Sequence, residues 1–149
     1  MEFYFKKVVK GGFQPSSFSL LFEAQLNFIP PAKANQYFQT KRGIRFIPKR
    51  IKEAIDDAVY ILSKFKPENP IDFPCQLYVI YTLPNRRKRD LDNLNKTLQD
   101  CLEKAGVVKD DSLFFRIISE KRQVKGVEAV DIKIYQAQTN IFLPGIACK

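Results

Sequence analysis

Two aspartates separated by one residue, Asp90 and Asp92, are the side chains of this sequence best suited to chemistry on a bound cation. They follow a predicted strand, along which alternate side chains point the same way, so both carboxylates could reach one ion. Oxygen ligands without histidine or cysteine favour Mg²⁺ or Mn²⁺ over zinc. The alternative is structural: Asp92 caps the following helix and Asp90 is an ordinary loop residue.

A lysine, Lys96, lies one helical turn beyond this pair. The predicted helix over 92–105 buries an apolar stripe, which consists of Leu94, Leu98, Cys101, Leu102 and Ala105. Asp92 and Lys96 lie on the opposite, open side, together with Gln99 and Glu103. Lys96 could stabilise the negative charge of a phosphorane beside the metal or orient the attacking water. Alternatively, it pairs with Asp92 and stabilises the helix by about 0.3–0.5 kcal/mol.

A second acidic pair, Asp110 and Asp111, lies in the short connector that follows this helix. Aspartate is common in turns, so an ordinary turn is the alternative explanation. The helix leads away from Asp92, and the chain must then come back to the sheet. Asp111 could therefore join Asp90 and Asp92 only if the connector lies over that site.

Basic residues surround the first acidic pair. A block of four precedes Asp90 directly: Arg86, Arg87, Lys88 and Arg89. A second basic tract without acids consists of Lys41, Arg42, Arg45, Lys49, Arg50 and Lys52. The chain carries 25 Lys and Arg against 16 acids, a net charge of +9, which favours a polyanionic partner. These cations suit phosphate binding beside a metal, and a solvated basic loop is the alternative.

Several classes of chemistry are excluded by what the sequence lacks. It contains no histidine, so serine–histidine and cysteine–histidine catalysis and histidine-ligated zinc are excluded. The three cysteines are odd in number and widely spaced, which indicates reduced residues, two of them in the core. No segment is apolar for long enough to span a bilayer. We therefore expect a cytoplasmic protein, with nucleic acid as the polyanion.

The order of apolar patterns predicts a mixed α/β (α+β) fold in a single compact domain with a small mixed sheet and two main helices. Residues 1–16 form an N-terminal extension, 17–135 the domain and 136–149 a C-terminal tail. Helices are predicted over 48–65 and 92–105. Strands are predicted over 18–28, 76–83, 113–124 and 127–135, the second of them central and the last two joined by a hairpin turn at Lys125-Gly126.

The stretch from Pro84 to Asp111 carries a joint pattern that is more specific than its parts. It runs P-x-R-R-x-R-D-L-D-N-L-x-K, then D-x-L-x-K-A-G, then D-D. This pattern resembles that of the RusA-like crossover-junction endodeoxyribonucleases. Upstream, I-P-P-A-K-A-N-Q-Y-F looks like the family's P-P-S-x-N-x-Y-Y segment, so the resemblance covers about residues 24 to 135.

The resemblance implies a homodimeric, Mg²⁺-dependent resolvase of four-way (Holliday) junctions, acting in DNA recombination and repair and often borne by phages or prophages. Mn²⁺ is expected to substitute for Mg²⁺. The family's catalytic, metal-binding aspartates match Asp90, Asp92 and Asp111, and its essential lysine matches Lys96. Asp100 and Asp110 also match acids of the pattern. The first twenty or so residues and those beyond Tyr135 have no counterpart in the family pattern.

Two other functions fit the same residues. One is a non-catalytic protein that binds junctions or duplex DNA through the basic surface, with the acids serving as caps. The other is a Mg²⁺-dependent nuclease for flaps or structured RNA. The expected DNA-binding residues are Arg86, Arg87, Lys88, Arg89, Lys41, Arg42 and Arg45.

Overall fold

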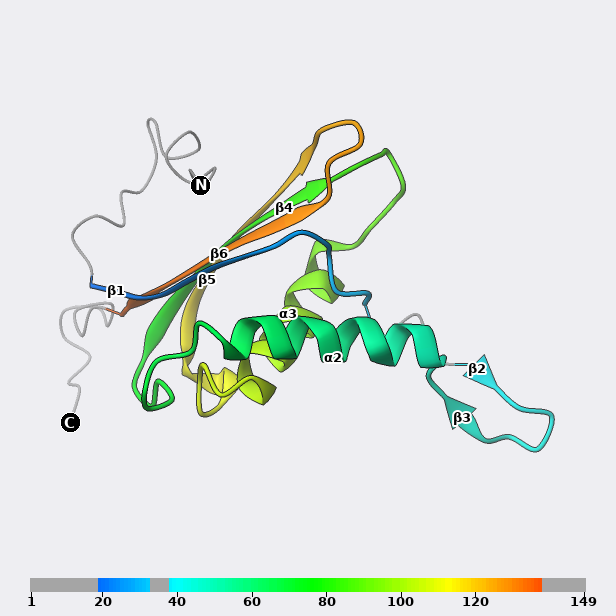
Figure 1. The fold of residues 1–149 in the computed structure, drawn as a ribbon, viewed down its shortest axis with the longest axis horizontal. Coiled ribbons are helices and arrows are strands. Elements are labelled where there is room, and N and C mark those ends of the chain that lie inside the picture. Colours follow the sequence, from blue (N-terminus) through cyan, green and yellow to red (C-terminus); the bar gives the residue numbers. More distant parts are fainter. Residues whose placement is uncertain (1–18, 33–37, 138–149) are drawn as a thin grey trace, which may run out of the picture.

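A mixed four-stranded sheet with two helices on one face forms the body of the protein (Figure 1). The computed structural model describes residues 19–32 and 38–137. The strands of the sheet are β1 (Leu20–Leu26), β4 (Cys75–Leu83), β5 (Phe114–Gln123) and β6 (Ala129–Gln136), and the helices are α2 (Lys49–Ser63) and α3 (Leu91–Lys104). The predicted mixed α+β class is confirmed. The extension 1–16 lies outside the described residues, as does the tail beyond residue 137.

Strand β4 is the centre of the sheet, whose order is β1-β6-β4-β5. Every residue of β4 is buried, as the unbroken apolar and β-branched run Q-L-Y-V-I-Y-T-L predicts for a central strand. Strand β6 pairs with it antiparallel and β5 pairs with it parallel. Parallel neighbours need a crossover connection, and α3 provides it. The chain therefore leaves β4 at its C-terminal end and runs back along the sheet through α3. It then begins β5 beside the N-terminal end of β4.

The predicted β5–β6 hairpin is wrong. Gly126 does adopt the positive φ of a turn residue, at 75°. However, β4 lies between the two strands, so β5 and β6 share no hydrogen bonds. The segment around Lys125 and Gly126 instead crosses the end of β4, where the Gly126 N–H donates to the Pro84 carbonyl at 3.1 Å.

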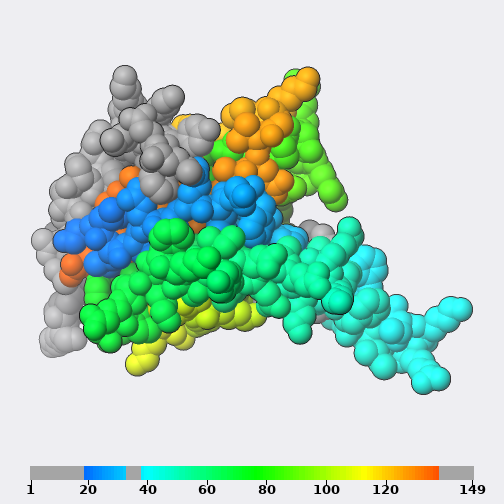
Figure 2. Space-filling view, viewed as in Figure 1, coloured from blue at the N-terminus to red at the C-terminus, as the bar shows by residue number. Residues whose placement is uncertain are grey.

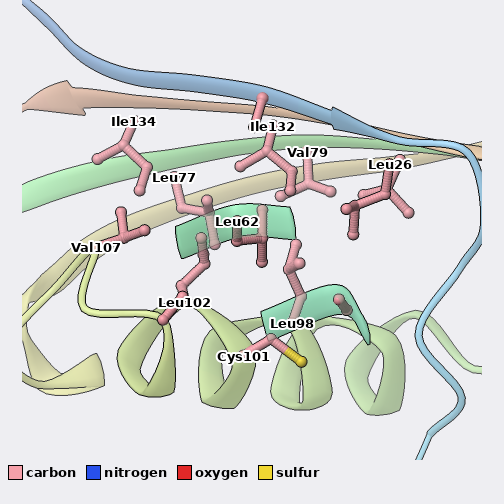
Figure 3. Close-up of a cluster of buried hydrophobic side chains, with 14 of the residues drawn as sticks. Leu26, Leu62, Leu77, Val79, Leu98, Cys101, Leu102, Val107, Ile132 and Ile134 are labelled. Carbon is pink, nitrogen blue, oxygen red and sulfur yellow. The ribbon is translucent and has the colours of Figure 1, made fainter. Parts of the chain in front are cut away.

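The core lies between the sheet and the two helices, and Figure 3 shows side chains from both layers meeting there. Leu62 of α2 and Leu98 and Leu102 of α3 have no exposed surface, and they face strand residues such as Leu77 and Ile132. Helix α3 ends before Gly106, whose φ of 80° suits the predicted stop signal. Both helices thus bury the apolar faces that their 3.6-residue periodicity predicts.

Two cysteines are part of this core. Cys75 and Cys101 are buried, reduced thiols, as predicted, whereas Cys148 lies outside the described residues. Burial raises the pKa of the Cys75 thiol to about 12, so it stays protonated at neutral pH. In the described parts of the chain, no helix is long and apolar enough to cross a membrane.

A short hairpin that the sequence patterns did not predict stands apart from this body. Its strands are β2 (Phe38–Gln39) and β3 (Arg45–Phe46), which pair antiparallel at the start of the second basic tract, for which no strand was predicted. Figures 1 and 2 show the hairpin, in cyan, projecting from the end of the molecule at which α2 begins. Strands of two residues are too short for alternation to indicate them.

Candidate active site

The N-terminus of α3 carries the first predicted pair of acids. Asp90 is the N-cap of the helix, and its Oδ1 accepts the N–H of Asp92 at 3.2 Å. The alternative to metal binding predicted that Asp92 caps the helix, but the capping residue is Asp90. Asp92 is exposed in the first turn. The positive end of the helix dipole favours negative charge at both positions.

Lys96 is exposed one turn further along α3, on the open side that the sequence predicts. In the described residues no ion pair joins Asp92 and Lys96, so the proposed helix-stabilising pair is not formed. The carboxylate and the ammonium group are thus both available to a ligand at the same end of the helix.

A polar link from the sheet fixes this end of α3. The Tyr81 hydroxyl donates to Asn95 Oδ1 at 2.9 Å, and Asn95 Nδ2 donates to Ser119 Oγ at 2.8 Å. Tyr81 is fully buried, and that burial raises the pKa of its hydroxyl, which therefore remains a proton donor. One asparagine thus joins β4, α3 and β5 directly beside Lys96. The sequence patterns did not predict this role of Asn95, although an asparagine inside a helix is unfavourable unless it finds a partner.

The basic loop before Asp90 divides into two parts. Arg89 is half-buried, and its guanidinium group forms an ion pair with the Glu128 carboxylate at 3.7 Å. Its backbone carbonyl accepts a hydrogen bond from Lys121 Nζ at 2.8 Å. Glu128 also accepts the N–H of Ile29 at 2.9 Å, which ties the segment after β1 to the same point. Arg89 therefore holds the loop in place. The remaining cations of the block, Arg86, Arg87 and Lys88, are exposed.

A cavity of about 630 Å³ opens beside Asp90. Apolar residues of the 28–32 segment, α2 and α3 form part of its lining. Cations also line it, namely Arg87, Lys88 and Arg89 from the loop and Arg50 from the first turn of α2. A carboxylate, apolar walls and several cations therefore surround one hollow, and a nucleotide offers matching base and phosphate groups.

Asp111 lies at the opposite end of α3. One of its carboxylate oxygens, one of Glu103 and one of Asp110 all lie within 4.8 Å of one another. Asp110 caps the 3-10 helix η3 (Asp111–Leu113), and the N–H of Ser112 donates to it at 2.8 Å. Hydrogen bonds from the Ser112 backbone and hydroxyl lower the pKa of Asp110.

The structure therefore does not bring the three predicted catalytic aspartates together within one chain. Helix α3 has 14 residues and, at about 1.5 Å per residue, is about 21 Å long. Asp90 and Asp92 lie at the start of α3, and Asp111 follows its end. This is because β5 is parallel to β4 and must begin beside the N-terminal end of β4. The connector over 106–110 does not lie over the first site, and Asp100 is half-buried on the helix between the two ends.

The donor atoms at both ends of α3 are of one chemical kind. Asp90 and Asp92 at one end, and Glu103, Asp110 and Asp111 at the other, offer carboxylate oxygens only. Such donors fit hard divalent cations such as Mg²⁺ and Mn²⁺, and they do not fit a zinc site built from histidine and cysteine. The predicted DNA-binding cations Lys41, Arg42 and Arg45 lie apart from both acidic groups, on the projecting β2–β3 hairpin.

A basic α+β domain that presents exposed carboxylates next to exposed arginines and lysines has the features of a divalent-metal-dependent nuclease. Comparison with known families agrees: the family model described as Endodeoxyribonuclease RusA matches residues 28–135. The chain belongs to this family. Membership confirms the predicted family and places the chain among the endodeoxyribonucleases, which are hydrolases.

Curated relatives carry the same family name. The chain is 39% identical over 117 residues to the crossover junction endodeoxyribonuclease RusA of Aquifex aeolicus (strain VF5). This match covers 78% of this chain and 93% of the relative. It is 32% identical over 82 residues to the proteins of the same name from Shigella sonnei (strain Ss046) and Enterobacteria phage 82. Each of these two matches covers 55% of this chain and 68% of the relative.

Proposed function

We propose that this protein resolves four-way (Holliday) DNA junctions by paired, symmetric, Mg²⁺-dependent nicks in recombination and repair, and that it acts in the cytoplasm. The observation that carries the proposal is the N-terminus of α3, where the exposed Asp90 and Asp92 lie beside exposed arginines and lysines. Family membership supports the substrate class, since the relatives are named crossover junction endodeoxyribonucleases.

The reaction is phosphodiester hydrolysis. A water oxygen bonds to phosphorus, the bond from phosphorus to the 3′-oxygen breaks, and a proton ends on that oxygen, leaving a 5′-phosphate and a ligatable nick. A bound Mg²⁺ would supply Lewis-acid polarisation of the phosphate and would make the attacking water more acidic. Asp90 and Asp92 would hold the cation, Lys96 would stabilise charge on the phosphate, and Arg86, Arg87 and Lys88 would position the DNA backbone.

Asp111 enters this scheme through a second copy of the chain. About 21 Å of helix separates it from Asp90 and Asp92, too far for the three to share a metal within one chain. A homodimer in which the start of one α3 meets the end of the other would complete two equivalent sites. Two-fold symmetry then matches two symmetric nicks in a four-way junction.

The test compares wild-type protein with Asp90→Asn on a labelled four-way junction, a duplex, a flap and a structured RNA in Mg²⁺. Wild type is expected to give paired symmetric nicks on the junction. The variant is expected to bind the junction as wild type does and to cleave at least 100-fold more slowly, because a neutral amide is a poor metal ligand. The matched control is Asp57→Asn, which removes an exposed carboxylate of α2 away from the site.

The other outcomes identify the alternatives. Binding without cleavage in both Mg²⁺ and Mn²⁺ would make the protein a non-catalytic junction- or duplex-binding protein. Faster cleavage of the flap or the RNA than of the junction would reassign the substrate, although the metal site would remain.

A further inference from the structure

The β2–β3 hairpin has an exposed position that the proposed cleavage site does not explain. All residues from Phe38 to Phe46 are exposed, and Figure 2 shows the hairpin extending beyond the packed body. It leads directly into α2, whose first turn carries Arg50 at the cavity beside Asp90. The hairpin therefore projects from the end of α2 that borders the proposed DNA-binding site.

Hydrogen bonds hold the tip of the hairpin in one shape. The Thr40 N–H donates to the Ile44 carbonyl at 2.9 Å, and the Ile44 N–H donates to Thr40 Oγ1 at 3.1 Å. The Gly43 N–H donates to the Thr40 carbonyl at 2.9 Å, and Gly43 has a φ of 82°, which favours glycine. A loop held by these bonds presents its side chains in a fixed arrangement.

The fixed tip presents apolar side chains to solvent. Ile44 is 62% exposed, and behind it Phe38 and Phe46 are 49% and 46% exposed, with ring centroids 6.1 Å apart. Exposed apolar groups gathered on a projecting element are unusual unless they contact a partner. The aromatic pair stiffens the base of the hairpin and leaves Ile44 at its end.

Charge identifies the partner. Lys41 and Arg42 are exposed at the tip beside Ile44. No acidic residue occurs in the sequence between Glu23 and Glu53, so the hairpin and the start of α2 are uniformly basic. An apolar side chain flanked by cations fits a nucleic acid, where phosphates surround stacked apolar bases.

We propose that the β2–β3 hairpin inserts Ile44 between bases at the branch point of the four-way junction, while Lys41 and Arg42 hold the neighbouring phosphates. This inference rests on the proposed function, because it takes the junction as the substrate. Apolar wedges in DNA-binding proteins unstack base steps in this way, and unstacking is least unfavourable where pairing is already interrupted. At the branch point all bases are paired, but two of the four strands pass from one helix to the other, so the stack there is held by fewer continuous strands than in a duplex.

The experiment measures base unstacking separately from cleavage. Junctions carry 2-aminopurine at the branch point and are bound in Mg²⁺ by protein that carries Asp90→Asn, so they remain uncut. Binding is expected to raise the fluorescence. Ile44→Ala should reduce that rise at least twofold and change Kd less than about threefold. Phe65→Ala, which truncates another exposed apolar residue (56%) beyond the far end of α2, should change neither quantity.

A second variant tests the cations. The Lys41→Ala, Arg42→Ala double variant should weaken binding and reduce the slope of log K against log salt by about 2 for each hairpin that contacts the junction, since each phosphate contact contributes about 0.9. Circular dichroism and gel filtration of every variant establish that it is folded and report its oligomeric state.

An equal fluorescence rise with and without Ile44 would overturn the proposal. Dissociation of a protein oligomer by Ile44→Ala would also overturn it, since the hairpin would then contact another copy of the chain. The wild-type protein could also leave the junction uncut in Mg²⁺ and Mn²⁺ while the fluorescence rise still depends on Ile44. That result would support base unstacking by the hairpin and refute the proposed cleavage.

Discussion

The buried carboxyl group of Asp131 in the sheet lowers the stability of the folded protein when it is ionised. It lies in β6 with no exposed surface, and its Oδ1 accepts Gln25 Nε2 at 2.7 Å. Its Oδ2 receives no hydrogen bond from the described residues. Burial raises the pKa of this carboxyl, and the hydrogen bond from Gln25 and the charges of Arg122 and Lys133 compensate only partly.

The first prediction follows from the direction of that pKa shift. A carboxyl with a raised folded-state pKa destabilises the fold once it ionises, so stability decreases as pH rises from the unfolded pKa through the folded one. Asp131→Asn keeps an oxygen for Gln25 and removes the charge. We expect a higher Tm than wild type at pH 7, and the gain should disappear below about pH 4.

Thermal denaturation followed by circular dichroism between pH 3 and pH 8 measures this difference. The control is Asp56→Asn, an exposed carboxylate of α2. A Tm difference for Asp131→Asn that does not vary with pH would show that the carboxyl is not a source of instability in the folded protein.

At the scale of elements, the docking of α3 on the sheet depends on Asn95. We predict that Asn95→Ala destabilises the fold by about 1–3 kcal/mol, because the buried Tyr81 hydroxyl loses its acceptor. Urea denaturation measures the change. Gln99→Ala, a half-buried position on the open side of the same helix, should change stability by less than about 0.5 kcal/mol. Equal effects of the two variants would exclude a special role for Asn95.

Sequence predicted the elements whose signals are local. The periodicity of α2 and α3 lies within each helix, and Asp90, Asp92 and Lys96 are close in sequence, so their shared location at one helix end could be expected. Strand pairing is not local. Nothing near Lys125 and Gly126 shows that β4 lies between β5 and β6, and the position of Asp111 depends on that same topology.

At the scale of the whole molecule, the separation of the acids predicts complementation between inactive proteins. Asp90→Asn and Asp111→Asn should each be inactive. Mixed dimers of the two would contain one site with both substitutions and one site with neither. We therefore expect the mixture to regain single nicks on the junction, at a rate near one quarter of wild type or below.

Unfolding and refolding the two proteins together ensures exchange of subunits, and a denaturing gel separates single from paired cuts. Each variant refolded alone is the control. A mixture as inactive as its components would mean that Asp111 and Asp90 act in the same chain or in different steps.

The strand order also determines when this chain can fold during its synthesis. Of the four described strands of this sheet, β1 is made first, yet its only neighbour among them is β6, which is made last. On the ribosome, β1 must wait with an unpaired edge until about a hundred further residues have emerged, and such edges recruit other chains. We therefore expect nascent chains that end before Ala129 to depend on chaperones, whereas chains that extend past Gln136 can close the sheet unaided.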